Sequence, residues 1–250
     1  MRRTPDWVWR LHAEVARYAI PFTFGRPPNP REQPGIHAAT CVAVETVHSR
    51  FIITARHVAE PARDAVQTSP AECLAGRVRL GLDQIALSDA SLDLATIPVT
   101  ETHVRLLEAD GYRVVRPDAW PPASELLMND PILAVGFPGA WRLHLSWDEI
   151  DFRSVTKLAL VHQLGSGQFA CQLDPAFVER YEVGDPDSLP AEQLPGMSGG
   201  PGFLVRQDLI IVPRLCGVIK HGLDLGDGNQ IIYFAPLNKI QSNGAIAAAP

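Results

Sequence analysis

The chain of 250 residues is long enough for one domain or two, and 46% of its residues are hydrophobic while 20% are charged. This composition is typical of a globular protein and excludes a largely disordered chain. The formal net charge of −6 argues against a nucleic-acid partner, because neutralising many phosphates needs a broad basic surface. No run of about 18 apolar residues occurs, so we expect no membrane span and no membrane partner.

The first residues predict a helix over 6–18. Trp7, Leu11, Val15 and Tyr18 follow one another at spacings of three and four, which places them on one helical face. Charged residues such as Arg10 interrupt the continuous apolar run that an export signal needs. We therefore expect a cytoplasmic protein with an N-terminal helix.

The cysteine pattern supports the same location. The four cysteines are far apart and form no CxxC pair, so free buried thiols are expected in the absence of an export signal. Two disulfides in an exported chain are the alternative. The residues concerned are Cys41, Cys73, Cys171 and Cys216.

From Ala38 onward the pattern changes to short β-branched runs. Two alternating runs around a turn at His48 to Arg50 predict a hairpin. Further strand-like runs are found at 77–82, 92–99 and 112–117, and about seven more follow the proline-rich segment 116–124, which is the best candidate for a linker. Pro236 is well placed to open a short closing helix.

Many short strands with helix only at the ends favour an all-β fold with two barrel-like halves. The expected parts are an N-terminal helical extension (1–30), a first β-barrel (31–117), a linker (118–128), a second β-barrel with a C-terminal helix (129–240) and a tail (241–250).

The glycine-rich segment LPGMSGGPGF, residues 194–203, surrounds one serine. A serine nucleophile needs a tight turn that exposes its hydroxyl, with backbone N–H groups free to bind an oxyanion. Gly196 and Ser198 are the candidate donors of those N–H groups, and Gly199 and Gly200 leave room for a substrate backbone. A serine between glycines is more often an ordinary turn, so the segment is informative only with its partners.

Two residues upstream are suitable partners for Ser198. A serine needs an adjacent base, and His57 directly follows the apolar strand FII, where a cleft can form. Asp93 enters an otherwise apolar strand, and burying a carboxylate is unfavourable unless it is paired. Asp93 is therefore either a strand-edge cap or the group that orients the His57 imidazole.

The segments FIITARHV, LDLATIPV and GMSGGPGF, in that order, resemble the three signature segments of trypsin/chymotrypsin-like serine peptidases. The similarity is greatest to the bacterial HtrA-type branch, although we expect no space for a PDZ module. The order His, Asp, Ser differs from the orders in subtilisins and α/β-hydrolases. The resemblance covers roughly residues 36–240, including the turn at Ile132 to Gly139.

The resemblance implies two six-stranded Greek-key barrels, with His57 and Asp93 on the first and Ser198 on the second. It implies a hydrolase in which Ser198 attacks a peptide carbonyl, His57 acts as base and then as acid, and Asp93 orients His57. Such a triad uses no cofactor and no metal, and the sequence has neither HExxH nor a Cys/His cluster at ligand spacing. The expected partner is a protein or peptide substrate.

The chain departs from the family pattern at several positions. Arg56 precedes His57 where a small residue is usual, and we expect its side chain to point away to solvent. Val58 follows His57 where secreted trypsins have a cysteine, so Cys41 lacks the usual disulfide partner. Met197 occupies the position of the aspartate of zymogen-activated members, which argues against activation by a freed N-terminus.

Substrate preference is the weakest inference. Glu192 would occupy the floor of the primary pocket and attract Arg or Lys, or it is a solvated loop residue. The strand containing Val218, Ile219 and Lys220 is expected to supply one pocket wall. Lys220 and His221 would then neutralise Glu192 or favour an acidic substrate residue instead.

Two alternatives to an active peptidase follow from the same residues. The first is an inactive trypsin-like fold that acts as a protein-binding or scaffold module. The second is a latent peptidase that a regulatory protein partner switches on through the helix at 6–18, where Trp7 and Trp9 offer apolar contact area. The simpler expectation for that helix is that it only packs on the barrels.

Overall fold

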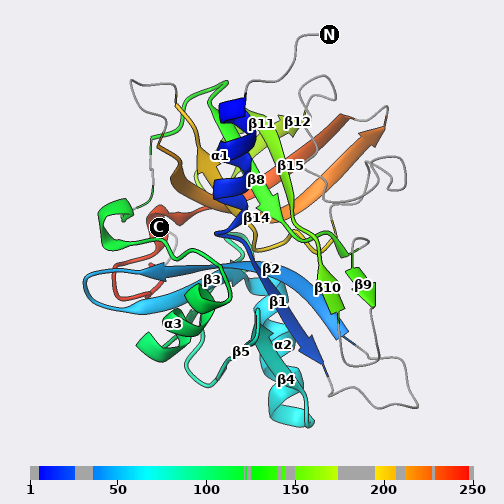
Figure 1. Cartoon of the computed structure of the whole chain (residues 1–250). Helices are drawn as coiled ribbons and strands as arrows, with labels where there is room; N and C mark the ends of the chain where they lie inside the picture. The colour runs from blue at the N-terminus through cyan, green and yellow to red at the C-terminus, as the bar shows by residue number, and fades with distance from the viewer. Residues whose placement is uncertain are drawn as a thin grey trace.

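Two β-sheets with separate strand orders form the framework of the computed structural model (Figure 1). The structure describes residues 6–25, 36–120, 122, 125–139, 142–144, 150–173, 195–206, 212–226 and 229–247. None of the helices within these ranges is long and apolar enough to cross a lipid bilayer.

The first sheet has seven antiparallel strands in the order β5-β4-β1-β2-β3-β7-β6. The predicted hairpin is confirmed, since Val44 of one strand lies opposite Phe51 of the next. The strands are β1 (Ile20–Gly25), β2 (Ile36–Glu45), β3 (Arg50–Ala55), β4 (Glu72–Ala75), β5 (Val78–Arg79), β6 (Ala86–Leu87) and β7 (Leu94–Pro98).

The second sheet closes into a six-stranded barrel in the order β11-β12-β15-β14-β13-β8. Its strands are β8 (Pro131–Gly136), β11 (Val155–Leu164), β12 (Phe169–Leu173), β13 (Pro201–Leu204), β14 (Arg214–Gly226) and β15 (Asn229–Pro236). A separate two-stranded sheet joins β9 (Arg142–His144) and β10 (Ile150–Phe152). The predicted mostly-β fold in two halves is confirmed. The second half is the expected six-stranded barrel, and the first half is a seven-stranded sheet where six strands were expected.

Helices occur at more places than the sequence patterns predicted. The expected N-terminal helix is α1 (Asp6–Ala16), which lies against β8 and β11 (Figure 1). Two helices were not predicted, α2 (Arg56–Thr68) and α3 (Glu101–Ala109). Short 3-10 turns are η1 (Pro117–Ala119) and η4 (Leu237–Lys239), and η4, which Pro236 precedes, stands where the closing helix was expected.

Two strand predictions differ from the structure. Residues 20–25 were expected to belong to the N-terminal helical extension (1–30), yet they form β1 between β4 and β2. Segment 112–117 contributes only an isolated bridge from Val115 to Val44. Most of the strand-like run at 209–212 lies outside the described residues.

Three apolar clusters form the core. One fills the first half and contains Phe22, Ile52 and Val58, and another fills the interior of the closed barrel. The third contains Phe51 from the first sheet together with Phe203 from the barrel. Because burial of apolar surface is the main favourable term in folding, this shared cluster holds the two halves together.

All four cysteines are buried and free, as predicted. Burial raises the pKa of the Cys73 thiol to about 12. Burial also raises the pKa of Cys41, of Cys171 and of Cys216. Thiols with raised pKa values are poor nucleophiles, so these side chains act as small apolar core residues.

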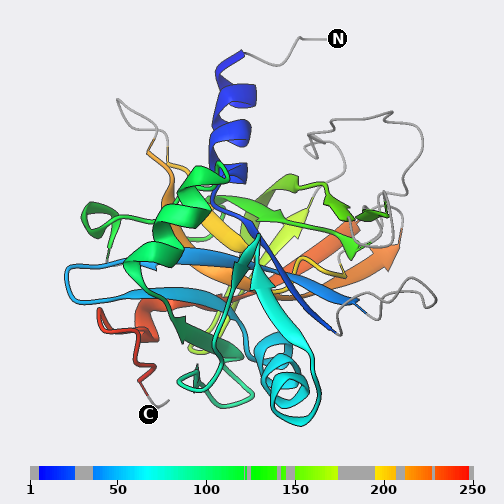
Figure 2. The ribbon, with the colours of Figure 1, turned by 60° about the horizontal axis from the view of Figure 1, so that its bottom comes forward.

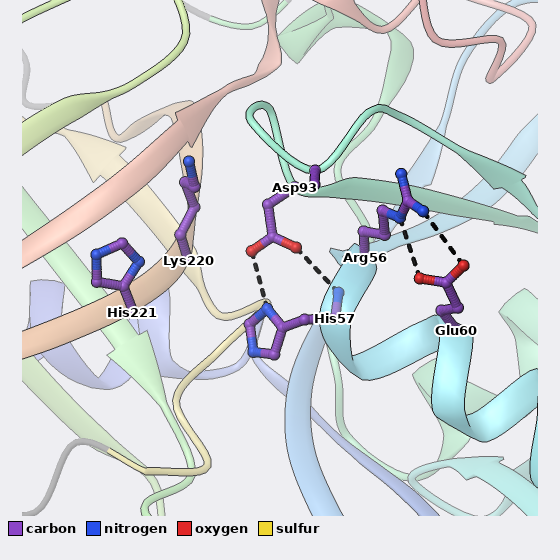
Figure 3. A pocket seen from close by; sticks show the side chains of 7 residues that line it. Arg56, His57, Glu60, Asp93, Lys220 and His221 are labelled. Carbon is purple, nitrogen blue, oxygen red and sulfur yellow. Dashed lines mark hydrogen bonds and ion pairs between the residues drawn. The ribbon is translucent and has the colours of Figure 1, made fainter.

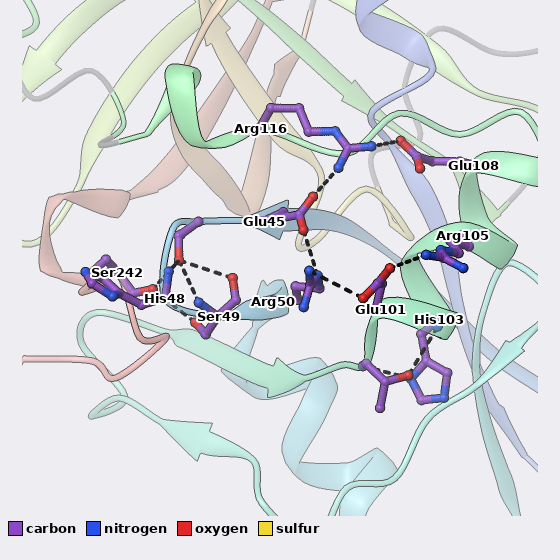
Figure 4. A network of polar contacts seen from close by, with 12 residues as sticks. Glu45, His48, Ser49, Arg50, Glu101, His103, Arg105, Glu108, Arg116 and Ser242 are labelled. Atoms are coloured by element: carbon purple, nitrogen blue, oxygen red, sulfur yellow. Dashed lines mark hydrogen bonds and ion pairs between the residues drawn. The ribbon is translucent and has the colours of Figure 1, made fainter.

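After η4 the chain returns from the barrel to the first sheet (Figure 2). The Ser242 carbonyl accepts hydrogen bonds from Ser49 Oγ at 3.0 Å and from Thr46 Oγ1 in the β2–β3 turn (Figure 4). Thr96 Oγ1 of β7 donates to the Gly244 carbonyl at 2.6 Å. Residues 242–244 therefore fasten the end of the second half onto the first.

Candidate active site

His57 is placed by the junction between β3 and α2. Strand β3 ends at Ala55 and the helix begins at the next residue, so His57 is in the first turn of α2 rather than at a free strand end. The N–H groups of a first helical turn have no partner within the helix. Ala55 has no capping side chain, and the His57 N–H donates instead to Asp93 Oδ1 at 2.9 Å.

Asp93 holds the His57 side chain as well as its backbone. Asp93 Oδ2 lies 2.8 Å from His57 Nδ1 (Figure 3), and Asp93 is 8% exposed. A carboxylate only accepts hydrogen bonds at neutral pH, so Nδ1 carries the hydrogen and Nε2 is left as the basic nitrogen. The Asp93 backbone has a φ of 56°, which aspartate tolerates better than most residues, and its carbonyl accepts from the Arg56 N–H at 3.1 Å.

The charge of Arg56 is paired within its own surroundings. Arg56 Nε lies 3.1 Å from Glu60 Oε2, one turn further along α2, and another guanidinium nitrogen donates to the Ser88 carbonyl at 2.6 Å (Figure 3). The side chain is 27% exposed. Arg56 therefore braces the helix against the loop before Asp93 rather than extending freely into solvent as expected.

The segment around Ser198 is held in place by its carbonyl oxygens. The Pro195 carbonyl accepts from the Gly139 N–H at 2.7 Å. The Gly196 carbonyl accepts from Thr40 Oγ1 at 2.9 Å, and the Ser198 carbonyl accepts from the Thr40 N–H at 3.0 Å. Thr40, a buried residue of β2, thus attaches this loop of the second half directly to the first sheet.

Two backbone N–H groups of the same loop are not engaged. Those of Gly196 and Ser198 donate to no acceptor among the described residues. With the carbonyls engaged and these two amides unengaged, the loop offers two donors for a negatively charged oxygen. These are the two amides that the sequence predicted for an oxyanion hole, and that role stays a prediction.

Two neighbours of Ser198 fix how closely the loop approaches each half. A Cβ at Gly199, whose φ is +82°, would lie 2.1 Å from the Thr40 carbonyl oxygen and 2.2 Å from Thr54 Oγ1. Only glycine permits that approach to the first sheet. On the other side, Met197 is fully buried in the interior of the barrel and packs against Gly136. An apolar side chain is therefore buried at the position that the resemblance assigns to the aspartate of zymogen-activated members.

The Ser198 hydroxyl donates to the Lys220 carbonyl at 3.1 Å. Within the described residues, no hydrogen bond joins it to His57. Lys220 is the extra residue of a β-bulge, since Ile219 pairs with Phe234 and His221 with Tyr233. A bulged residue is left out of the strand ladder, and here its carbonyl accepts the hydrogen bond from the Ser198 hydroxyl.

A cavity of about 340 Å³ opens beside His57 (Figure 3). The His57 side chain is 51% exposed there. His221 stacks on Tyr233 with ring centroids 4.6 Å apart, and burial, followed by the Lys220 charge, lowers the pKa of His221. The cavity is lined by Arg56, His57, Glu60, Ala90, Asp93, Lys220 and His221.

The structure separates the residues predicted for the substrate pocket. Lys220 lines the cavity beside His57. Val218 and Ile219 are 0% and 2% exposed and belong to apolar clusters. Glu192 lies outside the described residues. No group of three or more acidic, histidine or cysteine side chains that could hold a metal occurs within the described ranges.

Sequence reasoning missed Thr40, which positions the Ser198 loop. Thr40 Oγ1 accepts from the Phe137 N–H at 3.0 Å while it donates to Gly196. A β-branched residue in a strand is what any strand pattern contains. Its role arises only when the two halves meet, and no local signal marks it.

No protein-family model matches the chain, and no curated protein matches it in sequence. Similar solved structures include a thermostable serine protease, AL20, from an extremophilic microorganism, at 13% identity over 89% of this chain and 92% of that chain, with a TM-score of 0.48. Another is the protease Anisep from Arthrobacter nicotinovorans, at 10% identity over 89% and 90%, with a TM-score of 0.49. A third is the HtrA-type protease AlgW with a tripeptide, at 14% identity over 90% and 59%, with a TM-score of 0.47.

Proposed function

We propose that the chain is a serine endopeptidase, a hydrolase that cleaves peptide bonds of protein substrates through an acyl-enzyme on Ser198. The observation that carries the proposal is the 2.8 Å contact between His57 Nδ1 and Asp93 Oδ2 at the edge of an open cavity. That contact leaves Nε2 as the basic nitrogen, and the Ser198 loop meets the first sheet at Thr40.

In the proposed reaction, the Ser198 hydroxyl first rotates about χ1 from the Lys220 carbonyl to His57 Nε2. Such a rearrangement is a change between staggered rotamers, and catalytic hydrogen bonds often tighten only when substrate binds. His57 then takes the hydroxyl proton as Oγ bonds to the substrate carbonyl carbon. Asp93 stabilises the imidazolium that forms.

The carbonyl oxygen of the substrate becomes negatively charged in this step. The N–H groups of Gly196 and Ser198 would bind it, since they engage no described acceptor and the loop carbonyls are anchored. His57 next gives its proton to the leaving amine as the carbon–nitrogen bond breaks. Water, deprotonated by His57, hydrolyses the resulting ester and restores Ser198.

One observation favours the alternative of an inactive, protein-binding member of the fold. The Ser198 hydroxyl is bonded to the Lys220 carbonyl, and a serine fixed there would not be activated by His57. The two functions differ in whether the hydroxyl can leave that carbonyl.

The predicted regulatory partner of α1 stays a prediction. Val15 of α1 is fully buried in the cluster shared by the two halves, and Leu11 packs against that cluster. These contacts support a packing role for the helix. The side chains of Trp7 and Trp9 lie outside the described ones.

We also propose a reducing compartment, the cytoplasm, for this protein. The proposal is supported by four free thiols within the apolar clusters and the buried strands, at positions where oxidation would disturb packing. Subcellular fractionation with an antibody to the protein tests it, and recovery in an oxidising compartment would contradict it.

A fluorophosphonate probe tests the proposed function, because it phosphonylates only a serine that an adjacent base activates. We expect labelling of Ser198 in the full chain, identified by peptide mass spectrometry, together with cleavage of an unfolded protein substrate. Ser198→Ala is the control, and it should lose both while its thermal unfolding stays close to that of the unmodified protein. Absence of labelling under conditions where a reference peptidase reacts would favour the protein-binding function.

A further inference from the structure

A buried lysine lies next to the proposed catalytic pair. Lys220 is 6% exposed and is the bulged residue of β14. A bulge re-aims the side chain of the extra residue. Lysine side chains are rarely buried to this extent unless their charge is paired or hydrogen-bonded.

The Lys220 ammonium group joins three segments of the molecule. Nζ donates to the Ser91 carbonyl at 2.6 Å and to Gln168 Oε1 at 3.0 Å. Ser91 lies two residues before Asp93 in the first half, and Gln168 lies in the turn between β11 and β12 of the second. Lys220 therefore attaches the loop that presents Asp93 to the strand that holds the Ser198 hydroxyl.

Hydrogen bonds within the loop before Asp93 set its local shape, and Leu92 packs in the apolar cluster shared by the two halves. Asp89 Oδ1 accepts from the N–H groups of Ser91 at 2.8 Å and Leu92 at 2.9 Å. The Asp89 carbonyl accepts from the Asp93 N–H at 3.0 Å. This compact turn sets the local shape of the loop, and Lys220 fixes its position relative to the second half.

The charge of Lys220 acts on its acidic neighbours as well. Burial lowers the pKa of Lys220, while Asp93 and then Asp89 act in the opposite direction. The charged or titratable groups around His57 are Asp93 and Asp89 from the loop, Lys220 and His221 from β14, and the Arg56–Glu60 pair from α2.

We propose that Lys220 is a positioning residue. Its ammonium group fastens the Asp93 loop to β14 and so holds the Asp93 carboxylate in register with the strand that accepts the Ser198 hydroxyl. The catalytic consequence, a higher kcat, rests on the proposed peptidase function, but the link between the two segments does not.

The direction of the effect follows from the two hydrogen bonds. Without the ammonium group, the Ser91 carbonyl and Gln168 Oε1 lose their donor, and the loop before Asp93 loses this link to β14. The backbone amides of the loop should then exchange their hydrogens faster, and kcat should fall because Asp93 is held less firmly.

The test is hydrogen exchange of the loop amides in the full chain, followed by mass spectrometry, with Lys220→Met and Lys220→Gln as uncharged variants and Lys220→Arg as the charged one. We expect the segment around Asp93 to exchange about tenfold faster in both uncharged variants and to return toward the original rate in Lys220→Arg. Steady-state kinetics should show a lower kcat with KM nearly unchanged in the uncharged variants. Using two uncharged variants keeps the test valid if one of them fails to fold.

Lys157→Met is the matched control, since Lys157 is also buried, at 7% exposure, and donates to Gln230 Oε1 at 2.8 Å in the second barrel. We expect it to lower the melting temperature and to leave the exchange of the loop amides unchanged. The proposal is overturned if the uncharged Lys220 variants lower the melting temperature without speeding that exchange. Faster exchange in a protein that no fluorophosphonate labels would support the link and contradict the peptidase function.

Discussion

The two halves of the molecule contribute to the site in different ways. In the first half, Asp93 binds both the backbone N–H and the ring of His57, so the pair is already assembled. In the second half, the backbone around Ser198 is anchored through its carbonyls, but the hydroxyl is directed at the Lys220 carbonyl. In the first half the proposed catalytic side chains already contact each other, whereas in the second half only the backbone around Ser198 is held in place.

In the proposed reaction one side chain has to move, and the two halves indicate which. Rotating the Ser198 side chain changes one weak hydrogen bond and leaves the loop in place, whereas moving His57 would break two bonds to a buried carboxylate. We therefore expect Ser198, and not His57, to be the mobile one of the proposed catalytic residues. The variants below test each half in turn.

Asp93→Asn should have the largest effect, because it acts on the assembled half. An asparagine keeps the shape but can no longer impose the tautomer with hydrogen on Nδ1, and an equivalent change in a serine peptidase triad lowers kcat about 10,000-fold. Steady-state kinetics on a peptide substrate measures this.

Asp89→Asn is the matched control for that variant, since Asp89 lies in the same loop and its contacts to Ser91 and Leu92 need only an acceptor oxygen. We expect it to change kcat less than tenfold. Equal losses in the two variants would mean that the loop shape, and not the Asp93 contact to His57, controls the rate.

Gly199→Ala should damage the contact between the halves. The added methyl would overlap the Thr40 carbonyl and Thr54 Oγ1, and φ would stay at an unfavourable positive value. We expect a loss of roughly 3 to 5 kcal/mol in the free energy of unfolding and a fall of about 10 °C in melting temperature.

Gly81→Ala is the matched control for this variant, because an added methyl there meets no atom within 4 Å. Calorimetry should show a change within about 0.5 kcal/mol. If Gly199→Ala is as well tolerated as Gly81→Ala, the close approach of the Ser198 loop to the first sheet is wrong.

Thr40→Val should have the smallest effect of the three and should act on the anchored backbone alone. It removes the hydroxyl that bridges Gly196 and Phe137, which we expect to cost about 1 to 3 kcal/mol. Because the loop is then less well held, kcat should fall about tenfold.

Thr96→Val provides the comparison, since it also removes a buried hydroxyl that donates to a carbonyl, that of Gly244, outside the site. A similar loss of stability with normal kcat is expected there. Were both variants to keep full kcat, the anchoring of Gly196 would not matter for turnover.

Sequence patterns predicted the parts of the site that rest on local chemistry. The apolar strand before His57 and the glycines around Ser198 are features of neighbouring residues, and the two-barrel fold followed from runs of short strands. Met197 at the position of an aspartate was also visible. All of these are signals within about ten residues of the site residue.

Features that depend on contacts between distant segments could not be predicted. Pro61 lies inside α2, the helix that carries His57, and Pro21 lies inside β1. Proline is disfavoured inside a helix and inside a strand, so the sequence pattern predicted neither element. The bulge at Lys220 needs the register of two strands, since Ile219 and His221 both look like ordinary strand residues. The link from Thr40 to Gly196 spans 156 positions in the chain, and no pattern within one segment reports it.

The return of residues 242–244 to the first sheet has a consequence for synthesis on the ribosome. Thr46 and Thr96 are made early, but their partners Ser242 and Gly244 are made about 150 residues or more later. Nascent chains fold from the N-terminus as they emerge, yet these contacts cannot form until residue 244 has left the exit tunnel. Ser198 also emerges before this fastening has formed, so the contact between the two halves is completed only after the serine loop has been made.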